Sequence, residues 1–380
     1  MKIESLIVQG IPAKNNENGA IVPPIYLAST YVQPSIEEHQ TYAYGRGGNP
    51  TRNALEELIS KIEGVDYGFA FASGMAATTT AFNLFKSGDK ILVNSNVYGG
   101  TYRYLDTVFQ QQELSYELVD DFNLLSEEDI DTTVKALFIE TPSNPLLQVT
   151  DIQRLAAIAH QKGILIIVDN TFATPYLQKP FELGADIVLY SATKYLSGHA
   201  DVIAGLLTVA DSGLAARIKH LQNTLGNVLS PFDSYSLIRG IKTLSVRMDR
   251  QEANTVKILA FLKEHEAIAR LNYPGSASPE EAAIQKKQTR GNGSVFSIEL
   301  TEEYNPLKFV EELDLFDLAV SLGGVESLVC HPSTMTHESY AIELQEKIGI
   351  SAGLFRFAIG IEHVDDLIND LAQALDLAKK

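Results

Sequence analysis

The sequence has little cysteine, a shortage of positive charge and no long apolar run, and each of these absences excludes a class of protein. Its single cysteine, Cys330, rules out an internal disulfide framework. No apolar run approaches the ~20 residues that a bilayer-spanning helix needs. The N-terminal segment lacks the basic stretch, the long apolar core and the small-residue cleavage site of a signal peptide. These absences predict a soluble, cytoplasmic protein.

The charge balance restricts the partners that we expect. Lys and Arg total 30 against 48 Asp and Glu, which gives a net charge of −18. Such a protein repels nucleic-acid phosphates and anionic lipid surfaces, so we expect neither a nucleic-acid nor a membrane partner. An anionic small molecule is still a suitable ligand, because single arginines and local dipoles outweigh the overall field at close range.

The spacing of apolar residues predicts an arm and a large domain in the first two thirds of the chain. Residues 1–45 contain several prolines, which forbid a long helix, so we expect an extended arm. Residues 46–245 alternate helix-length segments with short apolar runs, and the first helix should end near Gly64. This alternation predicts an α/β domain with a mainly parallel sheet covered on both faces. The predicted strands are 68–71, 90–93, 136–139, 164–168 and 186–190.

The pattern changes over residues 246–380. Apolar residues alternate over 296–300 and again over 355–361, which is the period of half-buried strands. A helical spacing of apolar residues follows over 364–375. We therefore predict a second, smaller α+β domain at the C-terminal end of the chain.

Two predicted strands end in residues with ionisable side chains that are candidates for a catalytic or binding role. In a parallel α/β sheet, ligands bind beyond the carboxyl ends of the strands. Asp169 follows one buried run, where its carboxylate needs a cation or a protonated nitrogen, although a helix N-cap is an equally simple interpretation. Lys194 follows the next run with Ser191 and Thr193 beside it. Most lysines are solvated surface residues, but a desolvated lysine acts as a nucleophile or Schiff-base former.

A third strand end completes a pattern that fits one cofactor. The small residues around Gly74 and Met75 leave a predicted strand and enter a helix, and such a turn either binds an anion or is simply tight. Pyridoxal 5'-phosphate (PLP) needs a lysine for its aldehyde, an acid for its pyridinium nitrogen and a cradle for its phosphate. Lys194, Asp169 and this turn supply all three, so we predict PLP as the cofactor.

Competing motifs are incomplete. Ser191 to Lys194 matches the SxxK of penicillin-binding acyl-transfer enzymes, but their SDN and KTG elements are absent. Neither the GxxxxGK[ST] phosphate loop nor GxGxxG occurs. Cys330, His331 and His337 have no common zinc spacing, so we expect no metal and interpret them as core or site-lining residues.

Beyond these motifs, nearly the whole chain resembles the PLP-dependent transsulfuration enzymes of cysteine and methionine metabolism. That family includes cystathionine γ-lyase, cystathionine β-lyase, cystathionine γ-synthase and methionine γ-lyase. The resemblance implies an aspartate-aminotransferase-like, fold type I PLP enzyme. It rests on YGRGGNPTR (44–52), FASGMAAT (71–78), VYGGTYR (97–103), ETPSNP (140–145), VDNTF (168–172), YSATKYLSGH (190–199), SPFDSY (230–235), SLGGVESL (321–328) and MTH (335–337).

The resemblance assigns roles to the cofactor residues. It implies that Lys194 is the Schiff-base lysine and the proton shuttle at Cα, that Asp169 pairs with the pyridinium nitrogen, and that Tyr98 stacks on the ring and relays a proton. It also implies a homotetramer of obligate dimers, in which Tyr44 and Arg46 reach the phosphate of the neighbouring subunit. The phosphate in each subunit is expected to be held by Gly74, Met75, Ser191 and Thr193.

The resemblance also implies a substrate site. Arg356 resembles the arginine that grips the substrate α-carboxylate, although a surface salt bridge is the simpler interpretation of one arginine. Asn144 and Ser321 resemble residues beside that carboxylate and the lysine. Glu326 and Arg103 match the pattern of γ-lyases and γ-synthases.

A further question is which reaction of this family the chain catalyses. Glu326 and Arg103 favour a carbon–sulfur lyase that cleaves L-cystathionine by γ-elimination, and Gly100 departs from the cysteine of methionine γ-lyases. Ala43 replaces the acid usual before Tyr44, which favours a looser site that also processes cysteine or homocysteine, and Gly45 occurs in some β-lyases. The alternatives are a β-lyase, a γ-synthase that joins an O-acyl-homoserine to cysteine, and a catalytically idle relative. Intact Lys194 argues against the last.

Overall fold

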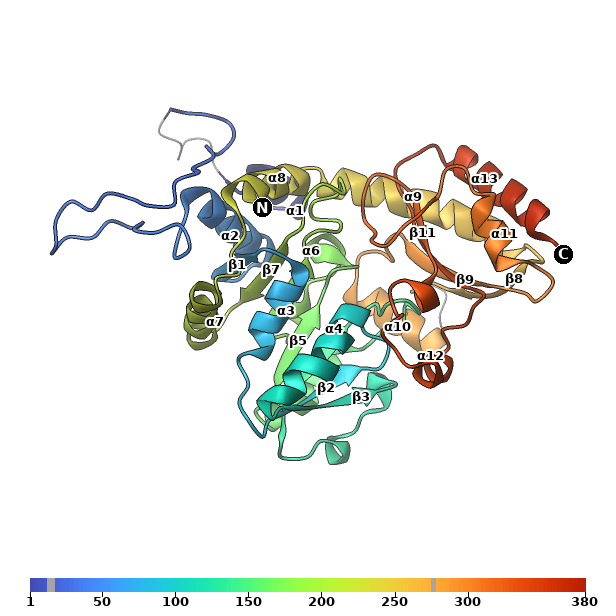
Figure 1. The fold of residues 1–380 in the computed structure, drawn as a ribbon, viewed down its shortest axis with the longest axis horizontal. Helices are drawn as coiled ribbons and strands as arrows, with labels where there is room; N and C mark the ends of the chain where they lie inside the picture. The colour runs from blue at the N-terminus through green and yellow to red at the C-terminus, as the bar shows by residue number, and fades with distance from the viewer. Residues whose placement is uncertain (12–17, 275–277) are drawn as a thin grey trace. The chain divides into compact units, whose positions relative to one another are not determined.

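The computed structural model describes residues 1–11, 18–274 and 278–380 (Figure 1). These residues divide into two compact units. The first unit comprises Met1–Phe85 and Asp186–Ser245, and the second comprises Lys86–Ala185 and Val246–Lys380. The junction at Ser245 coincides with the predicted boundary between 46–245 and 246–380. The three-part division itself stays a prediction, because the units group the chain differently.

Helices occupy both units. Helices of the first unit are α1 (Ile3–Gln9), α2 (Pro50–Glu63), α3 (Gly74–Phe82), α7 (Ser212–Leu225) and α8 (Pro231–Ile241). The long helix α9 (Leu244–Lys263) begins at the junction. Those of the second unit are α4 (Gly99–Tyr104), α5 (Ile152–Gln161), α6 (Thr174–Leu177), α10 (Pro279–Gln288), α11 (Pro306–Glu311), α12 (Ile342–Ile348) and α13 (Val364–Ala378).

The strands also divide between the units. The first unit holds β1 (Tyr67–Phe71), β6 (Ile187–Ser191) and β7 (Gly205–Val209). The second holds β2 (Lys90–Asn94), β3 (Ser115–Val119), β4 (Val134–Glu140), β5 (Leu165–Asp169), β8 (Ile268–Asn272), β9 (Val295–Leu300), β10 (Asp317–Leu318), β11 (Leu328–Cys330) and β12 (Leu354–Ala358). Each of the five strands predicted before residue 200 is confirmed, with small shifts of its bounds.

In the first unit, β7 pairs antiparallel with both β1 and β6. The sequence predicted mainly parallel pairing, but residues 192–204 join β6 to β7 without the crossover helix that a parallel pair usually needs. Helices α2 and α7 pack on β1, and α3 packs on β6 and β7. The predicted end of α2 at Gly64 is confirmed, since this residue adopts a left-handed φ of 74° that glycine tolerates.

In the second unit, four strands in the order β5-β4-β2-β3 are all parallel. Strand β4 is buried at six of its seven residues, which is why it reads as a continuous apolar run. Helix α5 packs on β4 and β5. The carboxyl ends of these two strands lie in register, with Glu140 opposite Asp169. Two carboxylates therefore meet at the edge of the sheet where ligands bind in this architecture.

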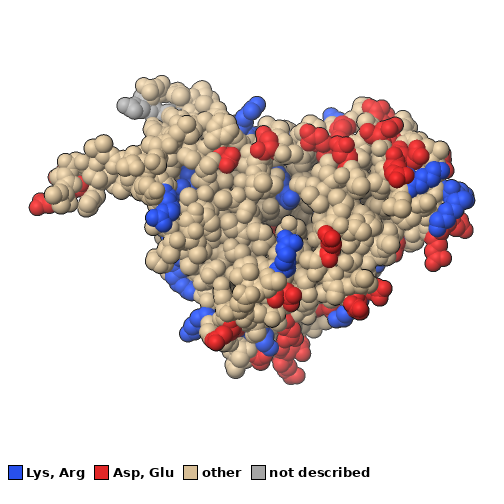
Figure 2. All heavy atoms as spheres, in the orientation of Figure 1, with Lys and Arg blue, Asp and Glu red and all other residues tan. Residues whose placement is uncertain are grey.

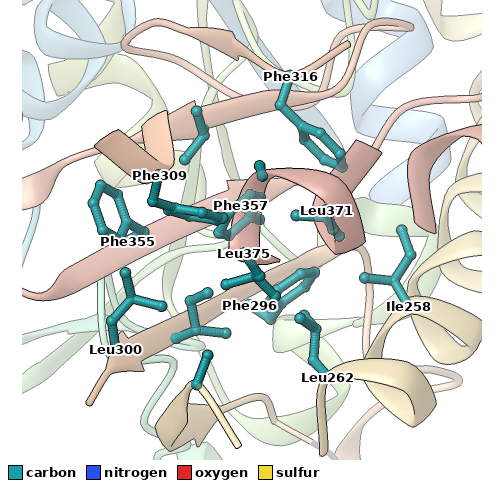
Figure 3. Packing of buried hydrophobic residues seen from close by; sticks show 14 of the residues in the cluster. Ile258, Leu262, Phe296, Leu300, Phe309, Phe316, Phe355, Phe357, Leu371 and Leu375 are labelled. Carbon is teal, nitrogen blue, oxygen red and sulfur yellow. The ribbon is translucent and has the colours of Figure 1, made fainter. Parts of the chain in front are cut away.

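A second sheet in the same unit has the order β10-β11-β12-β9-β8. Its apolar face packs against α9 and α13 (Figure 3). The rings of Phe296 on β9 and Phe357 on β12 stack with centroids 5.2 Å apart. Phe355 belongs to the same core, whereas Arg356 between them bonds to residues elsewhere in the unit. The two phenylalanines of β12 lie in this core as the alternation predicted, but the predicted half-burial is wrong, because all five residues of this strand are buried, Arg356 included.

The N-terminal arm contains one short helix, α1, followed after the first prolines by an extended segment. Residues 18–45 leave the body of the first unit as a long loop (Figure 1). A bridge between Thr30 and Tyr44 folds this loop back on itself. Large apolar side chains along it are exposed, namely Ile21, Leu27, Val32 and Ile36.

The surface of the second unit carries much of the negative charge on the face that Figure 2 shows, over the elements near the C-terminus. Helix α13, for example, has Asp365 and Asp366 in its first turn, where carboxylates interact favourably with the helix dipole. Among the described residues, no helix combines the length and the apolar character that a membrane span requires.

Candidate active site

In the first unit, the turn from β1 into α3 is shaped to receive an anion. The Ser73 side chain caps the helix by accepting the backbone N–H of Ala76. The first N–H groups of a helix have no partner within it, so those of Gly74 and Met75 are available to a ligand. A Cβ added to Gly74 would lie 2.8 Å from Cβ of Ser191 and 2.9 Å from its Oγ. Only glycine leaves this space open.

The end of β6 brings the other predicted phosphate residues to the same turn. Ser191 is the last residue of β6 and faces Gly74, as the distances above show. The Thr193 hydroxyl donates to the carbonyl of Ala204 and accepts the N–H of the same residue, at 3.2 and 3.0 Å. The Lys194 N–H donates to the Ser191 carbonyl at 3.1 Å, which makes a tight turn after the strand. Two hydroxyls and the lysine therefore follow one another beside the glycine turn.

In the second unit, Asp169 ends β5. Its Oδ1 accepts the backbone N–H of Thr171 at 3.0 Å and the Thr171 hydroxyl at 2.5 Å. Burial raises the pKa of this carboxyl to about 6, although the bonds from Thr171 oppose the rise. The N-cap interpretation is wrong, because Ala173 caps the next helix, α6. A desolvated carboxyl at this position is stabilised in its ionised form by a protonated nitrogen, which suits the PLP pyridinium.

Glu140, at the end of β4, was missed by the sequence interpretation. Its Oε2 accepts the backbone N–H of Tyr98 at 3.1 Å, and the backbone of Asn144 also bonds to this carboxyl. Its Oε1 is buried without a hydrogen-bond partner among the described residues. Burial, followed by the charge of Asp169, raises its pKa. Glu140 occupies a strand end just as Asp169 does, so the same rule was sufficient to find it.

Arg356 forms a buried fork in the second unit. Its Nη1 donates to Oδ1 of Asn144 and its Nη2 donates to the carbonyl of Ser321, both at 2.8 Å. Its Nε has no hydrogen-bond partner within the described ranges. The residue is only 2% exposed, so the surface salt-bridge interpretation is wrong. A buried guanidinium with an unused donor is suited to a carboxylate ligand.

Ser321 holds its carbonyl toward Arg356 in a strained conformation. Its φ is 96°, in the left-handed region that residues other than glycine rarely adopt. Such strain persists where the surrounding structure over-determines it, and it clusters at binding sites. The hydrogen bond from Arg356 Nη2 is one of the contacts that hold it.

Tyr98 precedes α4 in the second unit and is 42% exposed. Its ring lies over Gly100, where an added Cβ would lie 2.5 Å from the Tyr98 Cε1 atom. Gly100 therefore permits this ring position, and the ring keeps an exposed surface on which a planar cofactor could stack. Arg103 on α4 and Glu326, by contrast, are exposed residues of the same unit.

Tyr44 and Arg46 lie next to each other on the surface of the first unit. Tyr44 is 54% exposed, and the Arg46 guanidinium lies 5.7 Å from the centre of its ring. The buried side chain of Arg52 donates to the carbonyls of Gly45 and Arg46 at 2.9 and 3.1 Å. Arg52 thus anchors the loop, and the exposed Arg46 side chain also donates through Nη1 to the carbonyl of Asn223 at 3.0 Å.

Comparison with known proteins identifies the family of this chain. A family model described as Cys/Met metabolism PLP-dependent enzyme matches residues 4–376. The chain belongs to this family. PLP is therefore its cofactor, and the chain is an enzyme of PLP-dependent cysteine and methionine metabolism. The predicted resemblance is confirmed.

Curated relatives cover nearly the whole chain. The chain is 48% identical over 378 residues to cystathionine beta-lyase of Lactococcus lactis subsp. cremoris strain MG1363, which covers 98% of this chain and 99% of the relative. It is 44% identical over 380 residues to cystathionine gamma-lyase of Bacillus subtilis, which covers 99% and 100%. Relatives of both reaction types are thus similarly close.

Solved structures confirm the predicted α/β fold with its mostly parallel sheet and second sheet domain. Cystathionine gamma-lyase from Lactobacillus plantarum, complexed with L-serine, has a TM-score of 0.97 and 44% identity, and covers 100% of this chain and 99% of that chain. Cystathionine gamma synthase from Xanthomonas oryzae pv. oryzae, in complex with cystathionine, has a TM-score of 0.96 and 36% identity over 100% and 98%. The individual site roles stay predictions.

The residues of this chain fit PLP. The open space at Gly74, kept by the absence of a Cβ beside Ser191, suits a phosphate. The carboxyl of Asp169, whose pKa burial raises to about 6, suits a protonated ring nitrogen. Both groups are of the kind that the cofactor needs.

Proposed function

We propose that this chain is a carbon–sulfur lyase that cleaves L-cystathionine, by γ-elimination in preference to β-elimination. The observation that carries the proposal is the buried fork of Arg356, Asn144 and Ser321, which leaves Nε of Arg356 for a carboxylate. Relatives named as cystathionine lyases support the substrate class. The fork by itself indicates a substrate that carries a carboxylate.

PLP, when bound, supplies an electron sink that stabilises negative charge at the substrate Cα. Arg356 and Asn144 hold the substrate α-carboxylate and so orient the Cα–H bond. Lys194 would hold the cofactor through its aldehyde group, and its Nζ would serve as the base that moves the Cα proton. Asp169 would hold the proton on the ring nitrogen. Tyr98 would cover one face of the ring and exclude water from it.

The preference for γ-elimination rests on finer features. γ-Elimination removes a second proton, from Cβ, so Lys194 must serve two adjacent carbons. Glu326 and Arg103 are exposed side chains of the second unit and are available to a long substrate with a distal charge. The chief alternative is a cystathionine β-lyase, which the 48% identical relative favours. A γ-synthase is the further alternative, and the relative from Xanthomonas oryzae supports it.

The first experiment identifies the keto acid that forms from cystathionine. We expect 2-oxobutyrate and cysteine from the wild type, measured by mass spectrometry. Glu326→Gln should lower the yield of 2-oxobutyrate severalfold, whereas Glu343→Gln, at an exposed acid on α12, should leave it unchanged. Pyruvate with homocysteine as the main products would show β-elimination instead. No keto acid from cystathionine, together with formation of cystathionine from an added O-acyl-homoserine and cysteine, would favour the γ-synthase.

We further propose a homotetramer in which Tyr44 and Arg46 bind the phosphate of a neighbouring subunit. The two side chains are exposed and adjacent in one chain, and the loop that carries them is anchored by Arg52. Apolar side chains along residues 18–45, such as Leu27 and Val32, are also exposed, and a second copy of the chain would bury them.

This proposal predicts how well the protein retains its cofactor. Tyr44→Phe should speed PLP loss on dialysis by about threefold and Arg46→Ala by about 10-fold, because a charge-assisted bond is stronger than a neutral one. Tyr67→Phe, at another partly exposed tyrosine of the first unit, is the control and should change nothing. Absorbance of the retained cofactor measures the effect. Unchanged retention in both variants would contradict the shared site.

A further inference from the structure

His337 lies in the core of the second unit, although no predicted role uses it. It follows the short 3-10 helix Pro332–Thr334 and is 0% exposed. Its Nε2 lies 3.0 Å from the carbonyl oxygen of Asn144, a residue 193 positions earlier in the chain. A histidine ring thus reaches the backbone of the residue that bonds to Arg356.

The chemistry of the partners determines the direction of this bond. A carbonyl oxygen only accepts, so Nε2 carries the proton and donates to Asn144. In the neutral ring, Nδ1 then accepts from the Thr336 hydroxyl, 3.0 Å away. Burial, followed by the charge of Arg356, lowers the pKa of His337 to about 4, against the opposing effect of the Asn144 and Val97 carbonyls. The ring is therefore neutral near pH 7, with its tautomer set.

Asn144 is held on three sides. His337 donates to its carbonyl, Arg356 Nη1 donates to its Oδ1 at 2.8 Å, and its backbone also bonds to the Glu140 carboxyl. Asn144 itself is buried, at 3% exposed. Its side-chain oxygen therefore has a defined place, and the guanidinium that bonds to it has a defined orientation.

The histidine is itself held rigidly. The ring of Tyr340 lies 5.2 Å from the His337 ring and nearly perpendicular to it, at 67°. The Tyr340 hydroxyl donates to the carbonyls of Ser95 and Val97 at 3.2 and 2.9 Å. These contacts tie the segment 336–340 to the loop that leads into Tyr98, so the imidazole has little freedom to follow a displaced Asn144.

We propose that His337 is a positioning residue for recognition of the substrate α-carboxylate: its Nε2–H fixes Asn144 and, through Asn144, the Arg356 guanidinium. The inference rests on the proposed function in that Arg356 receives the carboxylate. It adds that carboxylate binding depends on a buried hydrogen bond to which the substrate contributes no atom.

Loss of the Nε2–H group should weaken binding of the substrate α-carboxylate. Without it, the Asn144 carbonyl is buried and unsatisfied, and the backbone moves toward another donor. A shift of Asn144 then removes one of the two contacts that orient Arg356. The effect should fall on binding of the α-carboxylate and leave the cofactor link at Lys194 intact.

The test compares four variants of the PLP-loaded protein. His337→Phe and His337→Met remove the donor with different shapes, and His337→Gln keeps an N–H donor. His331→Phe is the matched control, because His331 Nε2 also bonds to a backbone carbonyl, that of Ala352, at 3.0 Å. The readouts are KM and kcat for cystathionine, and dissociation constants for L-serine and for ethanolamine from changes in cofactor absorbance. Ethanolamine is L-serine without its carboxylate.

We expect His337→Phe and His337→Met to raise KM and the L-serine dissociation constant by about 10-fold to 100-fold, with kcat within about threefold of the wild type. The ethanolamine constant should stay within about twofold, His337→Gln should recover most of the loss, and His331→Phe should match the wild type.

An unchanged L-serine constant in both donor-less variants that fold would overturn the proposal, as would an equal loss for L-serine and ethanolamine. If the wild type fails to cleave cystathionine, only the proposed function fails. The L-serine constants still decide the role of His337, since their measurement needs no cleavage. If one donor-less variant does not fold, the other provides the same comparison with His337→Gln.

Discussion

Lys194→Ala should lower the rate of cystathionine cleavage by about 10⁴-fold and abolish the absorption band of the lysine-linked cofactor. The substitution removes both the covalent link and the base at Cα, and general acid–base catalysis alone contributes up to about 10⁴-fold. The turn that places Lys194 after Ser191 is set by backbone hydrogen bonds, so the fold should survive. Absorbance spectra and steady-state rates measure both effects.

Lys219→Ala is the control for this prediction. Burial lowers the pKa of Lys219, so it is a partly desolvated lysine in the same unit. Its replacement should leave the cofactor band unchanged. A band that persists in Lys194→Ala and disappears in Lys219→Ala would show that Lys219, and not Lys194, carries the cofactor link. A wild-type protein without any band would favour the catalytically idle relative instead.

Arg356→Ala should raise KM for cystathionine by about 100-fold to 1,000-fold and lower kcat as well. The substitution removes the cation that pairs with the carboxylate, and it leaves the Asn144 side chain without its donor. Arg356→Lys should recover only part of the loss, because an ammonium cannot reproduce the planar fork. Steady-state kinetics with each variant measure the effect.

Arg270→Ala controls for the loss of an arginine from the same sheet. Arg270 on β8 pairs with Glu299 at 3.0 Å, but its side chain is 41% exposed, so we expect the pair to contribute less than about 1 kcal/mol. This variant should keep wild-type kinetics. Equal kinetic losses in Arg270→Ala and Arg356→Ala would contradict the prediction. They would show that the arginines act by stabilising the sheet and not by binding the substrate carboxylate.

Each strand that the sequence predicted before residue 200 is buried at most of its residues. Strand β4 is the clearest example, since a strand with no exposed face needs apolar residues at almost every position. Strand β3 was not predicted because none of its five residues is fully buried, so its side chains carry no such constraint. Strand β7 was not predicted either, although all five of its residues are buried, and its antiparallel pairing with β6 was not foreseen.

The candidate site was predictable where chemistry coincided with a strand end. Asp169 and Lys194 stand out because a charged side chain after a buried run is costly without a partner. Glu140 satisfies the same rule and was overlooked, although its carboxyl is buried and accepts the backbone N–H of Tyr98. His337 was interpreted only as a core or site-lining residue, because the residues next to it in the sequence do not indicate its hydrogen-bond partner.

The sequence by itself determined the family, the cofactor and the alternation of strands and helices, because these depend on local apolar periodicity and on contiguous motifs. Only the tertiary structure brought Asn144 to His337, 193 residues away, and to Arg356, 212 residues away. The tertiary structure also gave Ser321 its strained φ of 96° and placed Glu140 opposite Asp169. Packing of distant segments decides these contacts, and no period along a single segment encodes them.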